Sequence, residues 1–363
     1  MKLTVLSVAY PLAPVGPDAV GGAEQILTHL DYALTRAGHR SVVVACEGSV
    51  TAGALVATPA AAGELTEEVR RDLQRAHYRN IVRALERWPV DVIHLHGIDF
   101  DGYLPPPGVP ALVTLHLPPG WYGPEVFRLR RPHTYLHPVS ASQRRACPPG
   151  AAVLPEIPNG VPLEGLAARH ARRNFALTLG RICPEKNFHT ALDAARLAGV
   201  PVLLASEVFR YEAHERYFRE EIVPRLGWGA RFIGPAGFRR KRRLLSAARC
   251  LLVPSLAPET SSLVSMEAIA CGTPVVAFPS GALPEVVEHG RTGFIVRSAE
   301  EMAEAMQAVD RLDREECRRL ARERFSLERM AGRYLEVYER LARLGREPHP
   351  DHDPAREGAL YAG

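Results

Sequence analysis

Short apolar runs alternate with helix-like patterns along most of the chain, and this alternation limits the folds that the chain can adopt. Such an order predicts βαβ units and parallel sheets. In the first half the apolar runs lie at residues 3–9, 42–45, 92–95, 112–115, 136–139 and 153–157. The second half repeats the scheme at residues 175–179, 202–205, 231–233, 251–253, 275–278 and 294–296. We therefore expect an α/β protein with parallel sheets in both halves.

Length and patterning also predict how the chain is divided. A chain of 363 residues is too long for one comfortable core. A polar segment at residues 162–174 has no strand pattern, which indicates a linker between the halves. The last helix would carry Met330, Tyr334 and Tyr338 on one face. We expect domains at residues 1–165 and 166–325, a final helix at residues 326–345, and a disordered tail at residues 346–363.

Composition and charge exclude several classes of protein. The net charge is only +4, so we expect no nucleic-acid partner. The cysteines are scattered without a C-x-x-C pair, which argues against a zinc site or a disulfide framework and fits a reducing cytoplasm. No stretch approaches the roughly 18 consecutive apolar residues of a membrane span. The apolar N-terminal run reads as a first strand rather than a signal peptide. We expect a cytoplasmic protein with at most peripheral membrane contact.

Residues 258–278 are the segment most informative about function. Glu259 and Glu267 frame the start of a short helix, and an all-apolar run follows it, as in a strand buried on both faces. A helix N-terminus presents unpaired N–H groups and the positive end of a dipole, which suit a phosphate. Ionised carboxylates only accept hydrogen bonds, which suits sugar hydroxyls. The combination predicts a sugar-nucleotide site.

Two further loops have residues that suit a phosphate. Arg181 and Lys186 lie in a loop between a predicted strand and a helix, where a planar fork and a compact point charge can bind a diphosphate. Gly21 and Gly22 begin the first long helix, and glycine lets backbone N–H groups approach a ligand closely. An ordinary charged surface loop and a simple flexible turn are the alternatives.

These segments together resemble the retaining glycosyltransferases of family 4, which have the GT-B fold of two Rossmann-like parallel-sheet domains facing a central cleft. The resemblance spans residues 3–345, and it implies that the helix at residues 326–345 crosses back to the N-terminal domain. The matching motifs are Gly21-Gly22-Ala23-Glu24, Ile157-Pro158-Asn159-Gly160-Val161, Gly180-Arg181-Ile182-x-Pro184-Glu185-Lys186, the pair Glu259 and Glu267 followed by Gly272-x-Pro274-Val275-Val276-Ala277, and Gly290-x-Thr292-Gly293-Phe294.

The chain also departs from the family pattern at two places. Family members usually have Gly-Phe-Gly after the first glutamate, where this chain has Thr260, Ser261 and Ser262. The family commonly has a glycine-bearing turn where this chain has Ser206-Glu207. The first departure could alter the donor pose or the preferred sugar, and the second weakens any expectation about nucleobase contacts.

The resemblance implies a retaining, metal-independent transfer of a sugar from a nucleoside diphosphate sugar, foremost a UDP-sugar, to a hydroxyl of a glycan, lipid or natural product. No cofactor would be needed. Glu267 would bind the ribose and Glu259 the donated sugar, while Arg181 and Lys186 would stabilise the departing diphosphate. The expected donor-binding residues are Gly22, Arg181, Lys186, Ser261, Ser262, Leu263 and Glu267, with Gly21 as a weaker candidate.

Histidines at strand ends are the candidates for contacts with the acceptor or the reacting centre. His116 ends a predicted parallel strand and would face the cleft, so we treat it with Glu259 as a catalytic candidate. His96 is a weaker candidate, and His94 reads as a buried, hydrogen-bonded residue. Ser140 and Arg144 match a family turn on the cleft floor.

Several alternatives stay open at this point. The basic run at residues 239–243 could be a solvated helical turn, or it could contact diphosphate or anionic lipid. A sugar-nucleotide epimerase would use the same fold, and a non-catalytic sensor would bind a donor without turnover. A Rossmann oxidoreductase ranks low because no G-x-G-x-x-G follows the first strand.

Overall fold

The computed structural model describes residues 1–61, 63, 65–227 and 229–346. Within this range the chain forms two compact units, one made of Met1–Pro158 with the chain from Glu328 onward, the other of Asn159–Leu327. The disordered tail expected at residues 346–363 lies, apart from Arg346, outside the described residues. Each unit has its own sheet and its own core, and each is described by itself below.

The N-terminal unit is built on a six-stranded sheet with the order β3-β2-β1-β4-β5-β6, in which all the pairs are parallel. Two apolar clusters cover its two faces: α2 packs in one and α1 in the other. Its strands are β1 Thr4–Val8, β2 Arg40–Cys46, β3 Ala54–Thr58, β4 Val92–Leu95, β5 Ala111–Thr114 and β6 Thr134–His137. Its helices are α1 Gly22–Arg36, α2 Glu67–Arg87, α3 Ala141–Arg145 and α12 Leu327–Leu344, with short η1 Phe100–Tyr103, η2 Pro119–Trp121 and η3 Pro124–Arg128.

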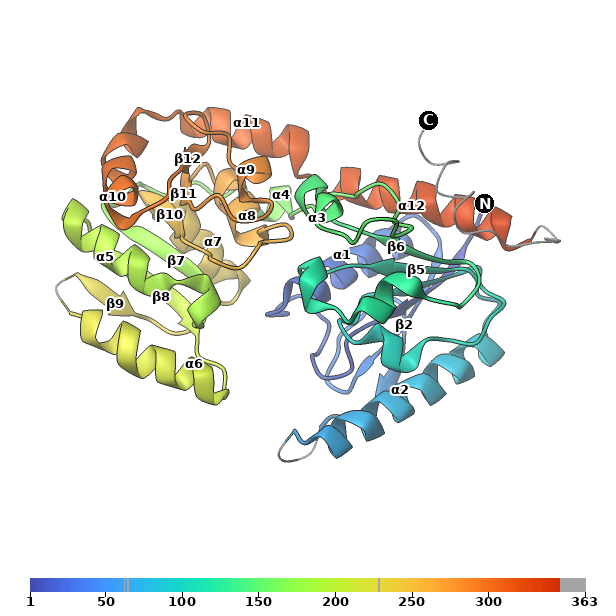
Figure 1. The fold of residues 1–363 in the computed structure, drawn as a ribbon. Helices are drawn as coiled ribbons and strands as arrows, with labels where there is room; N and C mark the ends of the chain where they lie inside the picture. The colour runs from blue at the N-terminus through green and yellow to red at the C-terminus, as the bar shows by residue number, and fades with distance from the viewer. Residues whose placement is uncertain (62, 64, 228, 347–363) are drawn as a thin grey trace. The chain divides into compact units, whose positions relative to one another are not determined.

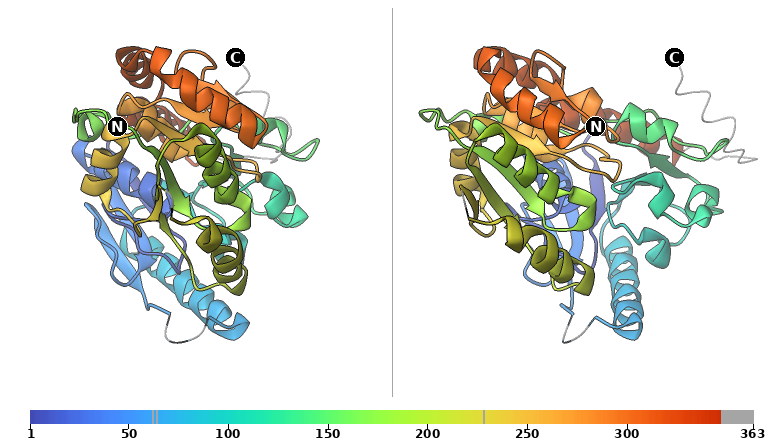
Figure 2. Two further views of the ribbon diagram at one scale, coloured as in Figure 1. Left: turned by 90° about the vertical axis from the view of Figure 1, so that its left-hand side faces the viewer. Right: turned by 60° about the vertical axis from the view of Figure 1, so that its left-hand side comes forward.

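The C-terminal unit repeats this plan with the strand order β12-β11-β10-β7-β8-β9, again all parallel. Helices α8 and α11 pack on one face and α5 and α10 on the other (Figure 1, Figure 2). The strands are β7 Ala176–Arg181, β8 Val202–Glu207, β9 Ala230–Phe232, β10 Cys250–Val253, β11 Val275–Ala277 and β12 Gly293–Ile295. The helices are α4 Leu163–Leu166, α5 Phe188–Ala198, α6 Glu212–Tyr217, α7 Phe238–Ala247, α8 Leu263–Ala270, α9 Leu283–Val286, α10 Ala299–Ala308 and α11 Arg314–Arg324, with η4 Pro184–Lys186, η5 Phe218–Ile222, η6 Val223–Arg225 and η7 Val309–Arg311.

The two crossings of the chain between the units lie next to each other. The backbone N–H of Val161 donates to the carbonyl of Phe325 at 2.8 Å, and Val161 forms an isolated parallel bridge with Ser326. The chain therefore enters and leaves the C-terminal unit at one place, and α12 then packs on the N-terminal unit. None of the helices in the described part of the chain is both long and apolar enough to span a membrane.

One strand was missed, and two expectations about local structure were wrong. The edge strand β3 was not predicted, because its residues are mostly exposed and form no buried apolar run. The strand predicted at residues 153–157 is only a single bridge between Leu136 and Val153. The segment predicted as a linker at residues 162–174 belongs to the C-terminal unit, since α4 lies in it and Leu166 is fully buried in the core. The division accordingly falls after Pro158 rather than after residue 165.

Candidate functional site

An ion pair joins two loops that follow neighbouring strands of the C-terminal sheet. Lys186, at the end of η4, places its Nζ 2.5 Å from Oε1 of Glu259, in the loop between β10 and α8. The Ser255 hydroxyl donates to the same oxygen at 2.6 Å. Both loops lie at the carboxyl ends of parallel strands, where such sheets bind ligands. Lys186 and Glu259 therefore come together at the edge where sequence reasoning placed a site.

The Glu259 carboxylate stays ionised although its side chain is only 13% exposed. Burial raises the pKa of this carboxyl, but the charge of Lys186 and the hydrogen bonds from Lys186 and Ser255 more than offset the effect and hold the pKa below 4.5. Its backbone is also held, because Ala282 N–H donates to the Glu259 carbonyl at 2.7 Å. Gly281 permits this approach: a Cβ there would lie 2.2 Å from the same carbonyl oxygen.

A second ion pair holds Glu267, one turn into α8. Its Oε1 lies 2.6 Å from Nζ of Lys241 on α7, and the two side chains are 3% and 15% exposed. Its other oxygen, Oε2, is buried and has no hydrogen-bond partner among the residues that the structure describes. A buried acceptor without a partner costs about 1–3 kcal/mol. An outside donor, such as a ligand hydroxyl, would recover this free energy.

The N-terminus of α8 has a left-handed backbone conformation that could not be predicted from the sequence. Ser262, its N-cap residue, has φ 58° and ψ 67°, a left-handed conformation that favours glycine. Ser262 stands where the family motif has its second glycine, and it adopts a conformation that glycine tolerates best. Strain of this kind costs on the order of 1–3 kcal/mol and clusters at functional sites. Ser261 precedes it and is buried, and Leu263 is the first residue of α8.

Arg181 ends strand β7 at an exposed position of the same sheet edge. Its guanidinium lies 5.7 Å from the ring centroid of Phe209, so the aromatic ring supports one side of the group. Gly180 just before it has φ 134°, a conformation that L side chains rarely adopt. The structure thus places Arg181, Lys186 and Glu259 on adjoining loops of one unit.

The glycine pair of the N-terminal unit has a structural role. Gly21 is the N-cap residue of α1 and Gly22 its first residue. A Cβ on Gly21 would lie 1.9 Å from Oε2 of Glu24, because the buried Glu24 carboxylate lies against this turn. A larger residue at position 21 would therefore displace the Glu24 carboxylate. A phosphate contact by Gly21 or Gly22 stays a prediction.

The predicted histidines of the N-terminal unit form one buried hydrogen-bonded chain. His116 Nε2 lies 3.1 Å from His96 Nδ1, and His96 Nε2 lies 3.0 Å from His94 Nδ1. His94 Nε2 lies 2.7 Å from the hydroxyl of Thr114, and His94 Nδ1 lies 2.6 Å from the hydroxyl of Tyr338. His94 is buried and hydrogen-bonded, as its sequence position indicated. His96 is equally buried, so neighbouring side chains take up the ring nitrogens of this second candidate.

The far end of this chain sets the tautomers of two of the rings. His137 Nδ1 lies 3.0 Å from the Pro138 carbonyl, which can only accept, so that nitrogen carries the hydrogen. His137 Nε2 then accepts from Thr114, and Thr114 accepts from His94 Nε2. His94 Nδ1 is therefore an acceptor, and both the Tyr338 hydroxyl and His96 Nε2 lie within hydrogen-bonding distance of it. Burial lowers the pKa of His137 to about 4 and of His116 to about 3, so both rings are neutral.

Two weaker candidates have structural partners. Ser140 is the N-cap residue of α3, and its hydroxyl accepts from the Gln143 N–H at 3.1 Å. Arg144 lies 3.5 Å from Glu156. These contacts account for both residues without a ligand, and their predicted place at a cleft floor stays a prediction.

Sequence reasoning missed Lys241, which lies within the basic run at residues 239–243. Arg239, Arg240 and Arg243 are exposed on α7, as the solvated-turn reading has it, whereas Lys241 binds Glu267 and Arg242 donates to the carbonyl of Gly165 at 3.1 Å. Contacts of the run with diphosphate or lipid stay predictions. A signal for Lys241 was present in the composition. Lysine occurs only at Lys2, Lys186 and Lys241, and every other cationic side chain among the 45 is arginine. Two of these rare lysines contact the two glutamates of the motif.

Comparisons with known proteins agree with this architecture. A family model described as "Glycosyltransferase Family 4" matches residues 20–153, and one described as "Glycosyl transferases group 1" matches residues 173–310. The glycogen synthase of Mycobacterium tuberculosis (strain CDC 1551 / Oshkosh) is 28% identical over 96% of this chain and 97% of its own. AviGT4, a glycosyltransferase involved in avilamycin A biosynthesis, is 25% identical with a TM-score of 0.71, covering 94% of this chain and 98% of its own.

A solved complex shows the same fold at lower identity. Anabaena Alr3699/HepE with UDP-glucose is 19% identical, with a TM-score of 0.71, and the match covers 93% of this chain and 100% of the other. The fold and the matches define a glycosyltransferase with the GT-B fold. More particularly, the chain belongs to the family 4, group 1 glycosyltransferases. The family resemblance and the fold class are thereby confirmed, whereas none of the proteins named here is an epimerase.

Proposed function

We propose that the protein is a retaining, metal-independent glycosyltransferase that moves a sugar from a nucleoside diphosphate sugar to a hydroxyl of a glycan, lipid or natural product. A UDP-sugar is the first donor to test, since a protein of the same fold binds UDP-glucose. The cytoplasm is the compartment that we propose, because all the cysteines are free thiols.

The observation that carries this proposal is the state of Glu267. Lys241 binds one carboxylate oxygen at 2.6 Å, which fixes the orientation of the group. The buried second oxygen lacks a partner within the described part of the chain. A ribose presents two neighbouring hydroxyl donors, and an ionised carboxylate can accept both. A ribose hydroxyl that donates to the unpartnered Oε2 would favour nucleotide binding at this place over other places on the sheet edge.

The diphosphate would lie against the cationic loop beside it. Arg181 and Lys186 supply fixed positive charge, and the N-terminus of α8 adds backbone N–H groups at Ser262 and Leu263. Charge accumulates on the diphosphate as the sugar departs, so these groups stabilise the transition state more than the ground state. We assign them the part that a divalent ion plays in other glycosyltransferases.

The transfer itself is assigned to a front-face substitution, as the family resemblance favours. The bond between the anomeric carbon and the diphosphate oxygen breaks while the acceptor oxygen bonds to the same face of that carbon. The acceptor proton passes to the departing phosphate oxygen. Glu259 is held by Lys186 and Ser255, so its role is to accept a hydroxyl of the donated sugar and position it. His116 stays the acceptor-side candidate.

Calorimetry with UDP on two matched variants tests the division of roles. Glu267→Gln should weaken UDP binding at least tenfold, since hydrogen bonds to charged groups are worth about 1.5–3 kcal/mol. Glu259→Gln should bind UDP nearly as the wild type does but transfer sugar more slowly. Glu304→Gln, exposed on α10, is the control that should change neither. Equal UDP affinity in wild type and Glu267→Gln would contradict the assignment of Glu267 to the ribose.

Acceptor and metal dependence test the reaction class. A transferase releases UDP faster when an acceptor is added, whereas an epimerase converts the donor sugar without one. We expect activity to persist in EDTA. Loss of activity in EDTA with recovery on adding Mg²⁺ or Mn²⁺ would contradict metal independence while leaving the glycosyltransferase class intact.

A further inference from the structure

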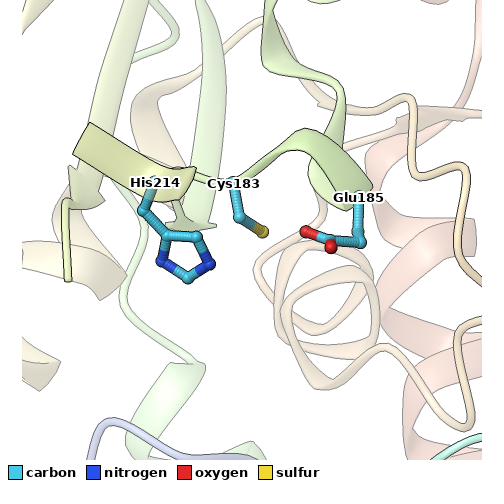
Figure 3. Close-up of side chains that lie close together, drawn as sticks. All are labelled: Cys183, Glu185 and His214. Atoms are coloured by element: carbon cyan, nitrogen blue, oxygen red, sulfur yellow. The ribbon is translucent and has the colours of Figure 1, made fainter. Parts of the chain in front are cut away.

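A cluster of three side chains lies beside Arg181 and has no part in the proposed reaction. Cys183 precedes η4, Glu185 lies within it, and His214 comes from α6. One ligand atom of each, the thiol sulfur, a carboxylate oxygen and a ring nitrogen, lies within 4.8 Å of the other two. Figure 3 shows Cys183 between His214 and Glu185. Side chains far apart in the sequence thus converge at one point of the C-terminal unit.

The donor set has the chemistry of a transition-metal site. Thiolate sulfur, imidazole nitrogen and carboxylate oxygen are the ligands that Zn²⁺ takes in proteins, and three protein ligands leave a fourth position for water. A thiolate, a carboxylate and a neutral imidazole carry two negative charges, which balance a divalent cation. A pair of exposed carboxylates would lack the thiolate and imidazole ligands that favour a transition metal.

One of the three groups lacks a hydrogen-bond partner among the described residues, and a second, the Cys183 thiol, makes only weak hydrogen bonds, one of them to the Arg181 carbonyl at 3.8 Å. His214 Nδ1 is buried and has no hydrogen-bond partner within the described ranges. The Cys183 thiol is buried, and it faces the Glu185 carboxylate closely enough to hydrogen-bond to it. A bound cation would satisfy the orphaned nitrogen and replace the thiol proton.

Two effects oppose binding and limit its strength. Burial raises the pKa of the Cys183 thiol, so a metal must displace its proton. Burial, followed by the charge of Arg181, lowers the pKa of His214, and the same guanidinium repels a cation. The lowered pKa of His214 keeps its ring neutral and able to ligate.

We propose that Cys183, Glu185 and His214 bind one divalent transition-metal ion, Zn²⁺ in the first place, which ties α6 to the loop that carries Arg181 and Lys186. The ion would brace this loop and take no part in sugar transfer. The spacing of cysteines along the chain argued against a zinc site because it registers only local C-x-x-C pairs, whereas two of these ligands are not cysteines and one comes from another helix.

The test is a titration of the metal-free full-length protein with Zn²⁺ by calorimetry and with Co²⁺ by absorbance. We expect one ion per chain, with a thiolate-to-cobalt charge-transfer band. Cys183→Ser should abolish that band and weaken binding at least tenfold, as should His214→Gln. Glu185 is exposed, so Glu185→Gln should leave folding intact and still weaken binding.

Matched controls separate this site from adventitious thiols and imidazoles. Cys147→Ser removes a partly exposed thiol of the other unit, and His189→Gln removes a histidine bonded to Tyr217 outside the cluster. Neither should change affinity, and circular dichroism should show all variants folded. Absence of binding, absence of the charge-transfer band in wild type, or unchanged affinity in both Cys183→Ser and Glu185→Gln would overturn the proposal.

Discussion

The two units place polar groups at the same end of similar sheets but use opposite chemistry. In the N-terminal unit, His94, His96 and His116 share one chain of neutral hydrogen bonds. In the C-terminal unit, Glu259 and Glu267 are each held by a lysine. Buried neutral groups need only hydrogen bonds, whereas buried charges need a partner of opposite sign. The same architecture thus places uncharged polar side chains at the end of one sheet and charged side chains at the end of the other.

This difference fits the proposed roles of the two units. A nucleoside diphosphate carries charge, and fixed lysines and arginines can bind it without reorganisation. An acceptor hydroxyl is neutral, and rings held in one tautomer can offer it a donor or an acceptor of defined direction. Three perturbations test whether this difference between the units affects stability and catalysis.

Mild acid should have the largest effect and should act on the N-terminal unit. Burial lowers the pKa of His77 and of His137 from 6.5 to about 4, so the folded state binds fewer protons than the unfolded chain. The stability is complete above pH 6.5 and is lost as the pH falls from 6.5 toward 4. Each such histidine should cost roughly 2 kcal/mol of unfolding free energy at about pH 5.

Hydrogen exchange with mass spectrometry, corrected for the intrinsic effect of pH, resolves the two units in this experiment. The C-terminal unit should hold at about pH 5, because the lowered pKa of Glu259 preserves its ion pair until the pH falls below 4.5. His189 and His214 have lowered pKa values as well, but both are partly exposed and contribute less. Equal loss of protection in both units would show that the contrast between them has no energetic consequence.

Replacing Lys186 should have the next largest effect, on catalysis. Lys186→Ala removes a charge placed where the departing diphosphate is proposed to gain one, and turnover should fall about 100-fold. Lys186→Arg keeps the charge but not the compact ammonium beside Glu259, so it should recover only part of the activity. Steady-state transfer rates measure both, with Lys2→Ala, at an exposed position, as the control. Wild-type turnover in Lys186→Ala would remove Lys186 from the proposed site.

The smallest effects are expected from two substitutions on α12, Tyr338→Phe and Tyr334→Phe. The Tyr338 hydroxyl lies 2.6 Å from His94 Nδ1, and losing this buried hydrogen bond should lower the free energy of unfolding by about 1 kcal/mol. Tyr334→Phe removes a longer contact to Thr114, at 3.3 Å, and should cost less. Urea unfolding compares the two with Tyr78→Phe, an exposed control on α2. A larger cost for Tyr334→Phe than for Tyr338→Phe would contradict the expectation that the shorter contact, to His94, contributes more to the free energy of unfolding.

The strands and the paired glutamates could be predicted because local pattern determines them. Buried parallel strands appear as continuous apolar runs, and Glu259 and Glu267 lie on either side of one helix start. Lys241 could not be found in this way, since its contact with Glu267 depends on how α7 packs against α8. The backbone of Ser262 could not be predicted for another reason. Serine disfavours the left-handed conformation, but the surrounding structure imposes it at this position. Edge strand β3 escaped detection because no face of it is fully buried.

The return of the chain to the N-terminal unit through α12 has a consequence for synthesis on the ribosome. His94 and Thr114 are translated early, but Tyr334 and Tyr338, which contact them, come after the whole C-terminal unit. At a synthesis rate of about 5–20 residues per second, the first sheet waits on the order of ten to forty seconds for its last helix. During that interval the face that α12 covers is open to chaperones. The C-terminal unit, whose two ends meet at Val161 and Phe325, can complete its fold before the N-terminal unit does.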